Sequence, residues 1–287
     1  MPSCGDASAC MMGWRKAMAD ESERTPAGTQ AVRKAVALLK AFSHDQPELS
    51  VAELSRRLGI HKSTVSRLLG ALELEGLVER NPETGRYRLG TELIVLAGQV
   101  VGHADLRLLA KPYLDALASR YGETANLVVL YHDSALNIEQ SVPAERQIKD
   151  IGWVGKRTPL HATSPGKVLL AFLPAEERAA LLARLRLHRY TPRTITERAE
   201  LEQELERVRR QGYALAQEEL EEGLNSAAAP VRDRSGRVCA AISLSGPAYR
   251  VTAERLPEIA AELMETAEQI SRRLGYVPAE PSSHQKP

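Results

Sequence analysis

The spacing of apolar and polar residues predicts two short helices between Ser50 and Leu72, in the run SVAELSRRLGIHKSTVSRLLGAL. Ser50 and Glu53 form a capping box at the start of the first helix, and Gly59 ends it. The second helix begins near Lys62 and buries an apolar stripe made of Val65, Leu68, Leu69 and Leu72. Two helices joined by a glycine-containing turn are typical of a helix-turn-helix, although an ordinary helical hairpin has the same spacing.

The face of the second helix opposite this stripe carries small hydroxyl and basic side chains. These residue types, near a helix N-terminus, suit contacts to DNA phosphates and to base edges in a major groove. We therefore predict a DNA-binding surface made of Lys62, Ser63, Thr64, Ser66 and Arg67.

A β-hairpin is predicted directly after these helices, from Leu77 to Gly90, where two strand-forming runs flank a turn rich in Asn, Pro, Thr and Gly. A hairpin with arginines in this place is typical of the wing of a winged helix, which lies on the DNA backbone or in the minor groove. Arg86 and Arg88 are the predicted wing contacts to DNA. The alternative is a solvated hairpin whose arginines have no such role.

Two further helices are predicted on either side of this region. Gln30–Ser43 has one apolar face that packs behind the helix pair, whereas Glu92–His103 is apolar on nearly all sides. A helix that is apolar on nearly all sides needs another protein surface to pack against. That partner is the equivalent helix of a second subunit or, alternatively, the chain's own C-terminal domain. Residues 1–28 lack periodicity and are predicted to be a disordered leader.

The rest of the chain, up to residue 275, alternates helices and strands and predicts an α+β domain with an antiparallel sheet. The predicted helices are Asp105–Tyr121, Gly166–Phe172 with Ser164 as its cap, Pro174–Leu185, Ala199–Gln211 and Thr252–Leu274. The predicted strands are Ala125–Tyr131, Leu136–Val142, Ile151–Val154, Tyr213–Gln217 and Arg237–Ser245. Residues 276–287 are predicted to be a disordered tail.

The last predicted strand has two unlike faces. Side chains alternate along a strand, so Val238, Ala240, Ile242 and Leu244 share one face, and Cys239, Ala241, Ser243 and Ser245 share the other. The apolar face predicts packing against helices. The face of small and hydroxyl residues leaves room for a ligand, or alternatively for a closely packed helix.

Charge and cysteine content narrow the class of protein. The net charge is only +1. Residues 27–90, however, contain ten Lys or Arg and seven Asp or Glu, a local excess that suits DNA binding by a dimer. Three cysteines supply neither a disulfide framework nor a four-ligand metal site. No run is long and apolar enough for a signal peptide or a membrane span, so we expect a cytoplasmic protein without a membrane partner.

The sequence lacks the motifs of common enzymes and of cofactor sites. It has no G-x-S-x-G, P-loop, metal-ligand spacing, or G-x-G-x-x-G after a strand, and we predict no catalytic residue, metal or cofactor. His161, Ser164 and Lys167 lie close together, but Ser164 is better used as a helix cap. A second candidate class is a metabolite-binding protein whose winged domain contacts protein; Lys62 and Arg67 favour DNA instead.

Four segments, in this order, resemble the IclR family of bacterial transcriptional regulators, over about Thr29 to Tyr276. They are LSVAELSRRLGIHKSTVSRLLGALELEGLVER, GRYRLG, PLHATSPGKVLLAFLP and GLNSAAAPVRDRSGRVCAAISLSGP. The resemblance implies an α+β fold with a winged helix-turn-helix at 29–90, a linker and dimerisation helix at 91–104, and a GAF-like effector-binding domain at 105–275. One departure is His61, where relatives commonly have proline; its imidazole is able to contact a phosphate.

The resemblance also implies a function and the residues for it. The chain is expected to be a ligand-responsive repressor of a catabolic or metabolic operon, binding a pseudo-palindromic operator in double-stranded DNA as a homodimer or homotetramer. Its effector is expected to be a small carboxylate, because loops and helix N-termini favour anions. The implied effector contacts are His161, Ala162, Gln217 (where the alignment can slip by one residue), Ser226, Ser243 and Ser245.

Overall fold

The computed structural model describes residues 29–43, 46–98, 103–143 and 153–277 of the chain. The chain divides into two compact units, residues 1–99 and 100–287. The predicted leader, residues 99–102 of the predicted linker helix, residues 151–152 of the third predicted strand and residues 278–287 of the predicted tail lie outside the described residues.

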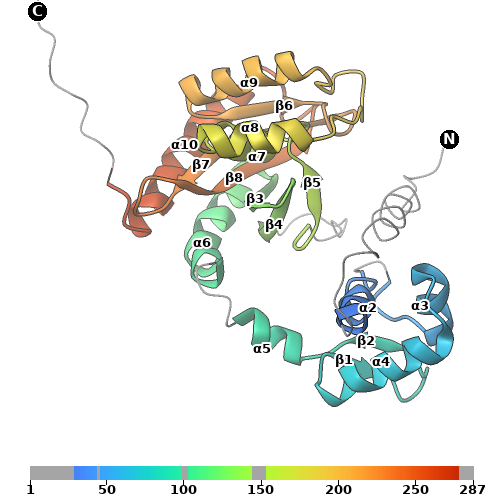
Figure 1. Ribbon diagram of the computed structural model, residues 1–287. Helices are drawn as coiled ribbons and strands as arrows, with labels where there is room; N and C mark the ends of the chain where they lie inside the picture. The colour runs from blue at the N-terminus through green and yellow to red at the C-terminus, as the bar shows by residue number, and fades with distance from the viewer. Residues whose placement is uncertain (1–28, 44–45, 99–102, 144–152, 278–287) are drawn as a thin grey trace, which may run out of the picture. The chain divides into compact units, whose positions relative to one another are not determined.

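The first unit is a winged helix-turn-helix, as predicted (Figure 1). The capping box of Ser50 and Glu53 is formed, and Gly59 ends the first helix of the pair with the left-handed φ of 68° that glycine tolerates. The elements are α2 Thr29–Leu39, α3 Val51–Leu58, α4 Lys62–Leu74, β1 Val78–Arg80, β2 Tyr87–Leu89 and α5 Glu92–Gly98.

A single small core holds this unit together. Leu38 of α2, Leu54 of α3 and Leu69 of α4 are fully buried and meet in it. The segment before α3 joins the hairpin through an isolated β-bridge, in which Leu49 and Tyr87 exchange two backbone hydrogen bonds of 2.9 Å. The helix pair and the hairpin therefore form one body.

The junction between hairpin and α5 depends on two glycines that lie against each other. The Gly76 carbonyl accepts a backbone hydrogen bond from Glu92, and a Cβ on Gly90 would stand 2.1 Å from that same oxygen. Gly76 itself has a φ of 67°. No side chain fits at Gly90, so the glycine that closes the GRYRLG segment sets where α5 begins.

The second unit is built on a six-stranded antiparallel sheet in the order β5-β4-β3-β8-β7-β6. Its strands are β3 Thr124–Tyr131, β4 Ser134–Ser141, β5 Arg157–Pro159, β6 Ala214–Gln217, β7 Leu224–Arg232 and β8 Val238–Pro247. Its helices are α6 His103–Tyr121, α7 Ser164–Ala171, α8 Ala175–Arg184, α9 Arg198–Gln211 and α10 Leu256–Arg273. Among the described helices, none has the length and apolar content needed to cross a membrane.

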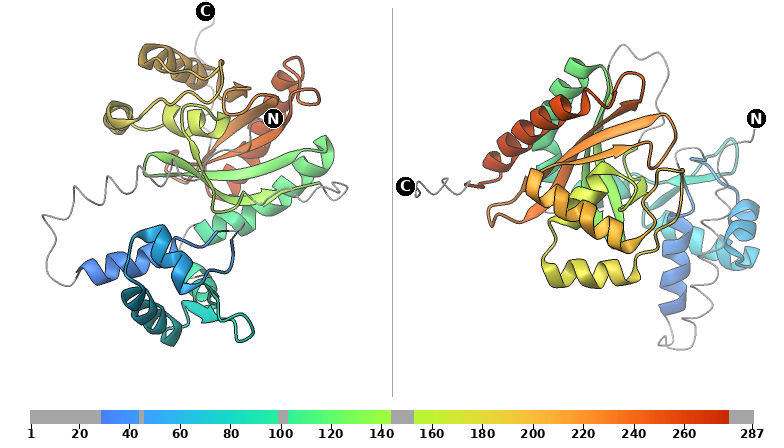
Figure 2. Two further views of the ribbon diagram at one scale, coloured as in Figure 1. Left: turned by 90° about the vertical axis from the view of Figure 1, so that its right-hand side faces the viewer. Right: turned by 90° about the horizontal axis from the view of Figure 1, so that it is seen from above.

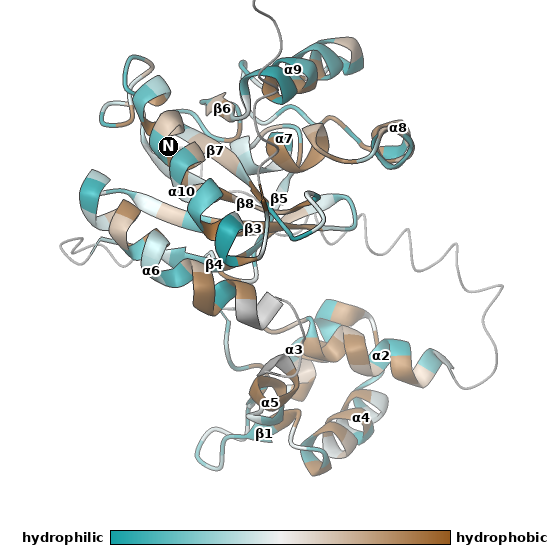
Figure 3. Ribbon diagram, turned by 90° about the vertical axis from the view of Figure 1, so that its left-hand side faces the viewer, coloured by the Kyte–Doolittle hydropathy of each residue, from teal (hydrophilic) through white to brown (hydrophobic). Residues whose placement is uncertain are grey.

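Helices cover both faces of this sheet (Figure 2). Helices α6 and α10 pack on one face, around Leu127, Ile242 and Leu263. Helix α7 packs on the other face, with α8 and α9 outside it. Figure 3 shows the difference in character, since α7 is largely hydrophobic while α9 is polar over most of its surface. The result is the α+β layering that was predicted.

The structure differs from the prediction at several elements. Strand β7 was not predicted, because its alanines and Pro230 carry little strand signal. The strand predicted at Ile151–Val154 is not formed at its described residues, Trp153 and Val154. The strand next to β4, at one edge of the sheet, is β5. Helix α10 begins at Leu256 instead of Thr252, because Pro257 occupies its first turn.

Two local predictions also need correction. The N-cap of α7 is Thr163, whose hydroxyl accepts from the Gly166 backbone, and Ser164 is the first helical residue. In β8 the register shifts, so that Val231 pairs with Ala240 while Arg232 pairs with Val238. The extra residue, Cys239, is a β-bulge and packs on the α6–α10 side, so the predicted alternation fails for the first two residues of β8.

We expect Gly90→Ala to lower the free energy of unfolding of the first unit by about 1–3 kcal/mol, because the added Cβ has no room beside the Gly76 carbonyl. Gly70→Ala is the matched control, since a Cβ there meets nothing within 4 Å and alanine favours a helix. Calorimetric unfolding of the full chain measures both variants. Equal stabilities would contradict the close approach.

Candidate DNA-binding surface and ligand cavity

Helix α4 presents its predicted polar face to solvent. Lys62, Ser63, Ser66 and Arg67 are exposed, and Thr64 is half-buried. Within the described part of the chain, neither cation has an ion-pair partner. A helix with free cations and small hydroxyls can approach a DNA groove without first breaking internal contacts.

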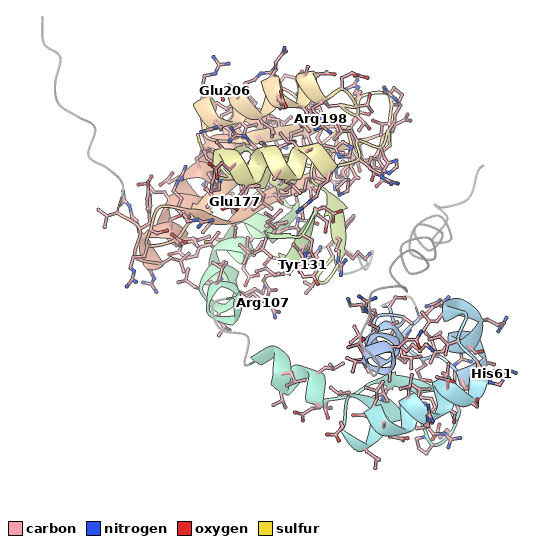
Figure 4. The ribbon with its side chains drawn as sticks, viewed as in Figure 1. His61, Arg107, Tyr131, Glu177, Arg198 and Glu206 are labelled. Carbon is pink, nitrogen blue, oxygen red and sulfur yellow. The ribbon has the colours of Figure 1, made fainter. Side chains whose placement is uncertain are left out.

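His61 is the N-cap of this helix. Its Nδ1 accepts a hydrogen bond of 3.4 Å from the Ser63 backbone and lies 2.9 Å from the Ser63 hydroxyl. Figure 4 shows His61 at the surface of the winged unit. The imidazole therefore has a local structural role, because it satisfies a backbone N–H that the first turn of α4 leaves open.

The two wing arginines are paired within the chain. Arg86 donates to both carboxylate oxygens of Glu53, at 2.7 and 2.8 Å, and so ties the hairpin to the start of α3. Arg88 pairs with Glu79 across the hairpin at 2.9 Å. The structure thus separates the predicted DNA residues into the free cations of α4 and a wing whose arginines also hold its shape.

The second unit contains a cavity on the α7 side of the sheet. Its space, counted together with its open mouth, is about 610 Å³. Four of the predicted effector residues line it, namely Ala162, Ser226, Ser243 and Ser245. The other lining residues are Asn126, Val128, Asn137, Trp153, Thr158, Thr163, Pro165, Ala216, Glu219, Leu220 and Leu224.

The cavity exists because small residues line up across neighbouring strands. Ala216 pairs with Ser226, and Ser226 pairs with Ser245, so the three form one row from β6 to β8. In the adjacent row, Ser243 pairs with Asn126 of β3. Short side chains on this face leave a volume that helix α7 does not fill.

Two predicted effector residues do not line the cavity. His161 is buried beside it, where its ring lies 2.9 Å from the His188 carbonyl, and burial lowers its pKa. Gln217 pairs with Asn225 and, by strand alternation, lies on the opposite face from Ala216.

The structure adds a buried charge cluster that the sequence analysis did not predict. Lys167 of α7 is 1% exposed, and its ammonium contacts Glu219 at 2.6 Å, Glu204 at 3.4 Å and the Leu215 carbonyl at 3.0 Å. Burial raises the pKa of the Glu219 carboxyl, and Lys167 opposes that shift. The signal was present, because a single lysine in the apolar run SPGKVLLA needs buried partners.

Comparisons with known proteins agree with this architecture. The family model for the bacterial transcriptional regulator IclR C-terminal domain matches residues 98–272, and the model for the IclR helix-turn-helix domain matches residues 31–82. The chain therefore belongs to the IclR family. It is a DNA-binding transcriptional regulator and not an enzyme.

Individual relatives of this IclR-family chain cover most of its length. The regulator XynR of Escherichia coli strain K12 is 38% identical over 86% of this chain and 98% of its own. The repressor AllR of Klebsiella pneumoniae is 34% identical over 88% of this chain and 92% of its own. The crystal structure of an IclR homologue from Microbacterium hydrocarbonoxydans, complexed with 4-hydroxybenzoate, is 30% identical with a TM-score of 0.76, covering 85% of this chain and 98% of that one.

The lowered pKa of the Glu53 carboxyl predicts that the stability of the first unit depends on pH. Hydrogen bonds from Ser50 and Arg86 lower the pKa of Glu53 from 4.5 to about 2. A carboxyl with a lowered pKa stabilises the fold above its unfolded pKa, and this contribution is lost as the pH falls from about 4.5 towards about 2. We expect Glu53→Gln to lower the melting temperature at neutral pH, with a deficit that shrinks across this range.

Glu73→Gln is the control, because Glu73 is exposed on α4 and its carboxylate has no hydrogen bond or ion pair to the described residues. Melting curves of the three proteins between neutral and acid pH make the comparison. A constant deficit for Glu53→Gln would contradict the assigned link between hairpin and α3.

Proposed function

We propose that this regulator is a ligand-responsive repressor of a catabolic or metabolic operon, acting in the cytoplasm on a pseudo-palindromic operator. The observation that carries the DNA-binding part is the exposed face of α4, with Lys62 and Arg67 free of ion pairs among the described residues. In this proposal Ser63, Thr64 and Ser66 contact bases or phosphates beside them. Repression is supported by the name of the AllR relative.

The wing completes the DNA interface in this proposal. Arg88 is exposed, so its guanidinium can reach a phosphate while it also pairs with the Glu79 carboxylate. Arg86 is half-buried against Glu53, so its first task is to hold the hairpin at a fixed angle to α3. A guanidinium has five N–H donors, which allows both arginines to keep an internal carboxylate and still bind DNA.

The proposed oligomer is a homodimer or a homotetramer built from dimers. Within the first unit, helix α5 exposes Ile94, Val95 and Leu96, and Ile94 is 72% exposed. Helix α2 exposes Val32 and Val36. Apolar surface of this kind marks a protein interface, and a closed dimer presents two recognition helices to the two halves of one operator.

The proposed effector site is the cavity beside α7, with Ser226, Ser243 and Ser245 on its floor and Ala162 on its wall. In this proposal the effector is a small carboxylate, because the positive end of the α7 helix dipole lies beside Thr163 and Pro165, which line the cavity, and favours an anion. The Microbacterium homologue with 4-hydroxybenzoate gives a precedent for a carboxylate. The effector acts only if it binds one arrangement of the winged units more tightly than another.

We expect Arg67→Ala to weaken operator binding by about tenfold or more and to reduce the slope of log affinity against log salt by about 2, because both subunits of the proposed dimer lose one cation. Electrophoretic mobility shifts on the DNA upstream of the protein's own gene and of its divergent neighbour, at several stated salt concentrations, measure both. Arg209→Ala on the exposed side of α9 removes the same charge outside the proposed interface and should bind as the wild type does. A shift that Arg67→Ala leaves unchanged would place the recognition surface elsewhere.

We expect Ile94→Glu to shift the chain from dimer towards monomer, because the interface would have to bury an unpaired carboxylate. Sedimentation velocity over a range of concentrations measures the change. Val277→Glu replaces another strongly exposed apolar residue and serves as the control. An Ile94→Glu chain that stays dimeric would remove α5 from the proposed interface.

A further inference from the structure

The segment that runs from the last residue of α8 to the first residue of α9 carries a dense cluster of arginines. Residues 184–198, the arginine loop, contain five arginines and one glutamate, in a chain whose net charge is only +1. All five of these arginines are exposed, namely Arg184, Arg186, Arg189, Arg193 and Arg198. Figure 4 labels Arg198, where α9 begins.

Four of the five guanidinium groups have no carboxylate partner. In the described part of the chain, Arg193 alone of the five forms an ion pair, with Glu218 at 3.0 Å. Where the others make hydrogen bonds, the acceptors are neutral, as for Arg189 and the Thr196 hydroxyl at 2.9 Å. Cations gathered without carboxylates raise the local positive potential, which attracts an anion from outside the chain.

The first half of the arginine loop presents its basic side chains in a row. Leu185 and Leu187 are half-buried against the core on the α7 side of the sheet, whereas Arg184, Arg186 and His188 are exposed. The backbone at Leu185 is extended, with φ −69° and ψ 130°. Alternate residues of an extended chain share one side and lie about 7 Å apart. A row of cations suits a linear polyanion, whose charges also repeat along a line.

The second half of the arginine loop is fixed to the rest of the unit. The Thr191 hydroxyl donates to the Glu218 carbonyl and the Thr194 hydroxyl to the Glu219 carbonyl, both at 2.6 Å. The Thr194 hydroxyl also accepts from the Thr191 backbone at 2.8 Å. The loop backbone is therefore ordered before any partner binds, which lowers the entropic cost of binding.

The chemistry of the loop favours phosphates over a protein surface. An arginine binds a phosphate through two parallel N–H···O bonds, and every lysine-or-arginine position of the loop is arginine. Tyr190 is the single exposed large hydrophobic residue within 184–198, a range that the structure describes completely. The loop thus lacks the apolar centre of a protein interface. Proteins of this family bind DNA, so duplex DNA is a polyanion that the winged unit brings to the second unit at high effective concentration.

We propose that the arginine loop is a second DNA-contacting surface, which binds the phosphate backbone of duplex DNA without reading its sequence. The inference rests on DNA binding by the family and needs neither the proposed operator nor the proposed effector. Helix α4 then supplies the sequence-dependent contacts, and the loop adds affinity that depends on salt.

The first test removes two unpaired cations from the full chain, in the double variant Arg184→Ala, Arg186→Ala. Fluorescence anisotropy of a long, labelled duplex of random sequence, at several stated salt concentrations, measures binding. We expect binding about tenfold weaker or more, and a slope of log affinity against log salt that falls by about 2 for each subunit whose loop contacts the duplex.

The matched control is the double variant Arg209→Ala, Arg210→Ala, which removes two exposed arginines from the last turn of α9. It should bind as the wild type does, and unchanged melting temperatures show that both variants fold. The proposal is overturned if the loop variant keeps the wild-type slope, if the control loses as much, or if the wild type does not bind random duplex at low salt. Failure of the proposed operator or effector leaves these results unchanged, because neither is present.

The second test identifies the class of partner. The photo-cross-linking amino acid p-benzoylphenylalanine replaces His188 in the loop or, as the control, Gln203 on the exposed side of α9. With random duplex present, we expect a covalent adduct with DNA from position 188 and none from position 203. The absence of a DNA adduct from position 188 overturns the proposal, and capture of a second copy of the chain there would assign the loop to a protein interface instead.

Discussion

The second unit depends on the burial of one ammonium group. Lys167 is fully enclosed on a helix whose other residues are also buried, so its charge must be met by protein groups. Its partners are the Glu204 carboxylate of α9, the Leu215 carbonyl of β6 and the Glu219 carboxylate of the segment after β6. Removing one partner of such a buried pair typically costs about 3–5 kcal/mol, so these contacts fix α7, α9 and β6 relative to one another.

That constraint also determines where the cavity lies. Helix α7 approaches the loop before it so closely that a Cβ on Gly166 would stand 2.4 Å from the Leu160 carbonyl. The start of α7 is therefore held tightly, while the sheet beneath it carries alanine and serine. Close packing at the helix and short side chains on the strands leave the cavity between them. Glu219 belongs to both features, since its carboxylate pairs with Lys167 and the residue lines the cavity.

Local signals in the sequence were enough for the winged unit. The capping box, the left-handed Gly59 and the period of α4 all act within a few residues, so the helix pair could be predicted. The partner of Arg86 could not, because Glu53 lies 33 residues away. Strand β7 was not predicted for a related reason, because its alanines form a strand only through pairing with β6 and β8.

The candidate ligand site, too, could be predicted from the sequence only as far as local rules apply. The small face of β8 predicted the floor of the cavity, because strand alternation is a local rule that holds after the bulge at Cys239. The wall could not be predicted, since it needs Glu219 brought back to Lys167 across 52 residues. Sequence identified which residues were small and polar. Tertiary contacts decided which of them share one cavity.

The distribution of charge in the winged unit bears on how such a regulator can be switched. Two of its arginines are held by internal carboxylates, and α4 contributes two free cations. Few phosphate contacts release few counterions, so one unit alone would bind DNA weakly at physiological salt. A dimer doubles these contacts at little further entropic cost when its two recognition helices match the operator spacing. In the proposed dimer, an effector need not alter the recognition surface, because a change in spacing that moves one of the two helices out of its groove would be enough to weaken DNA binding.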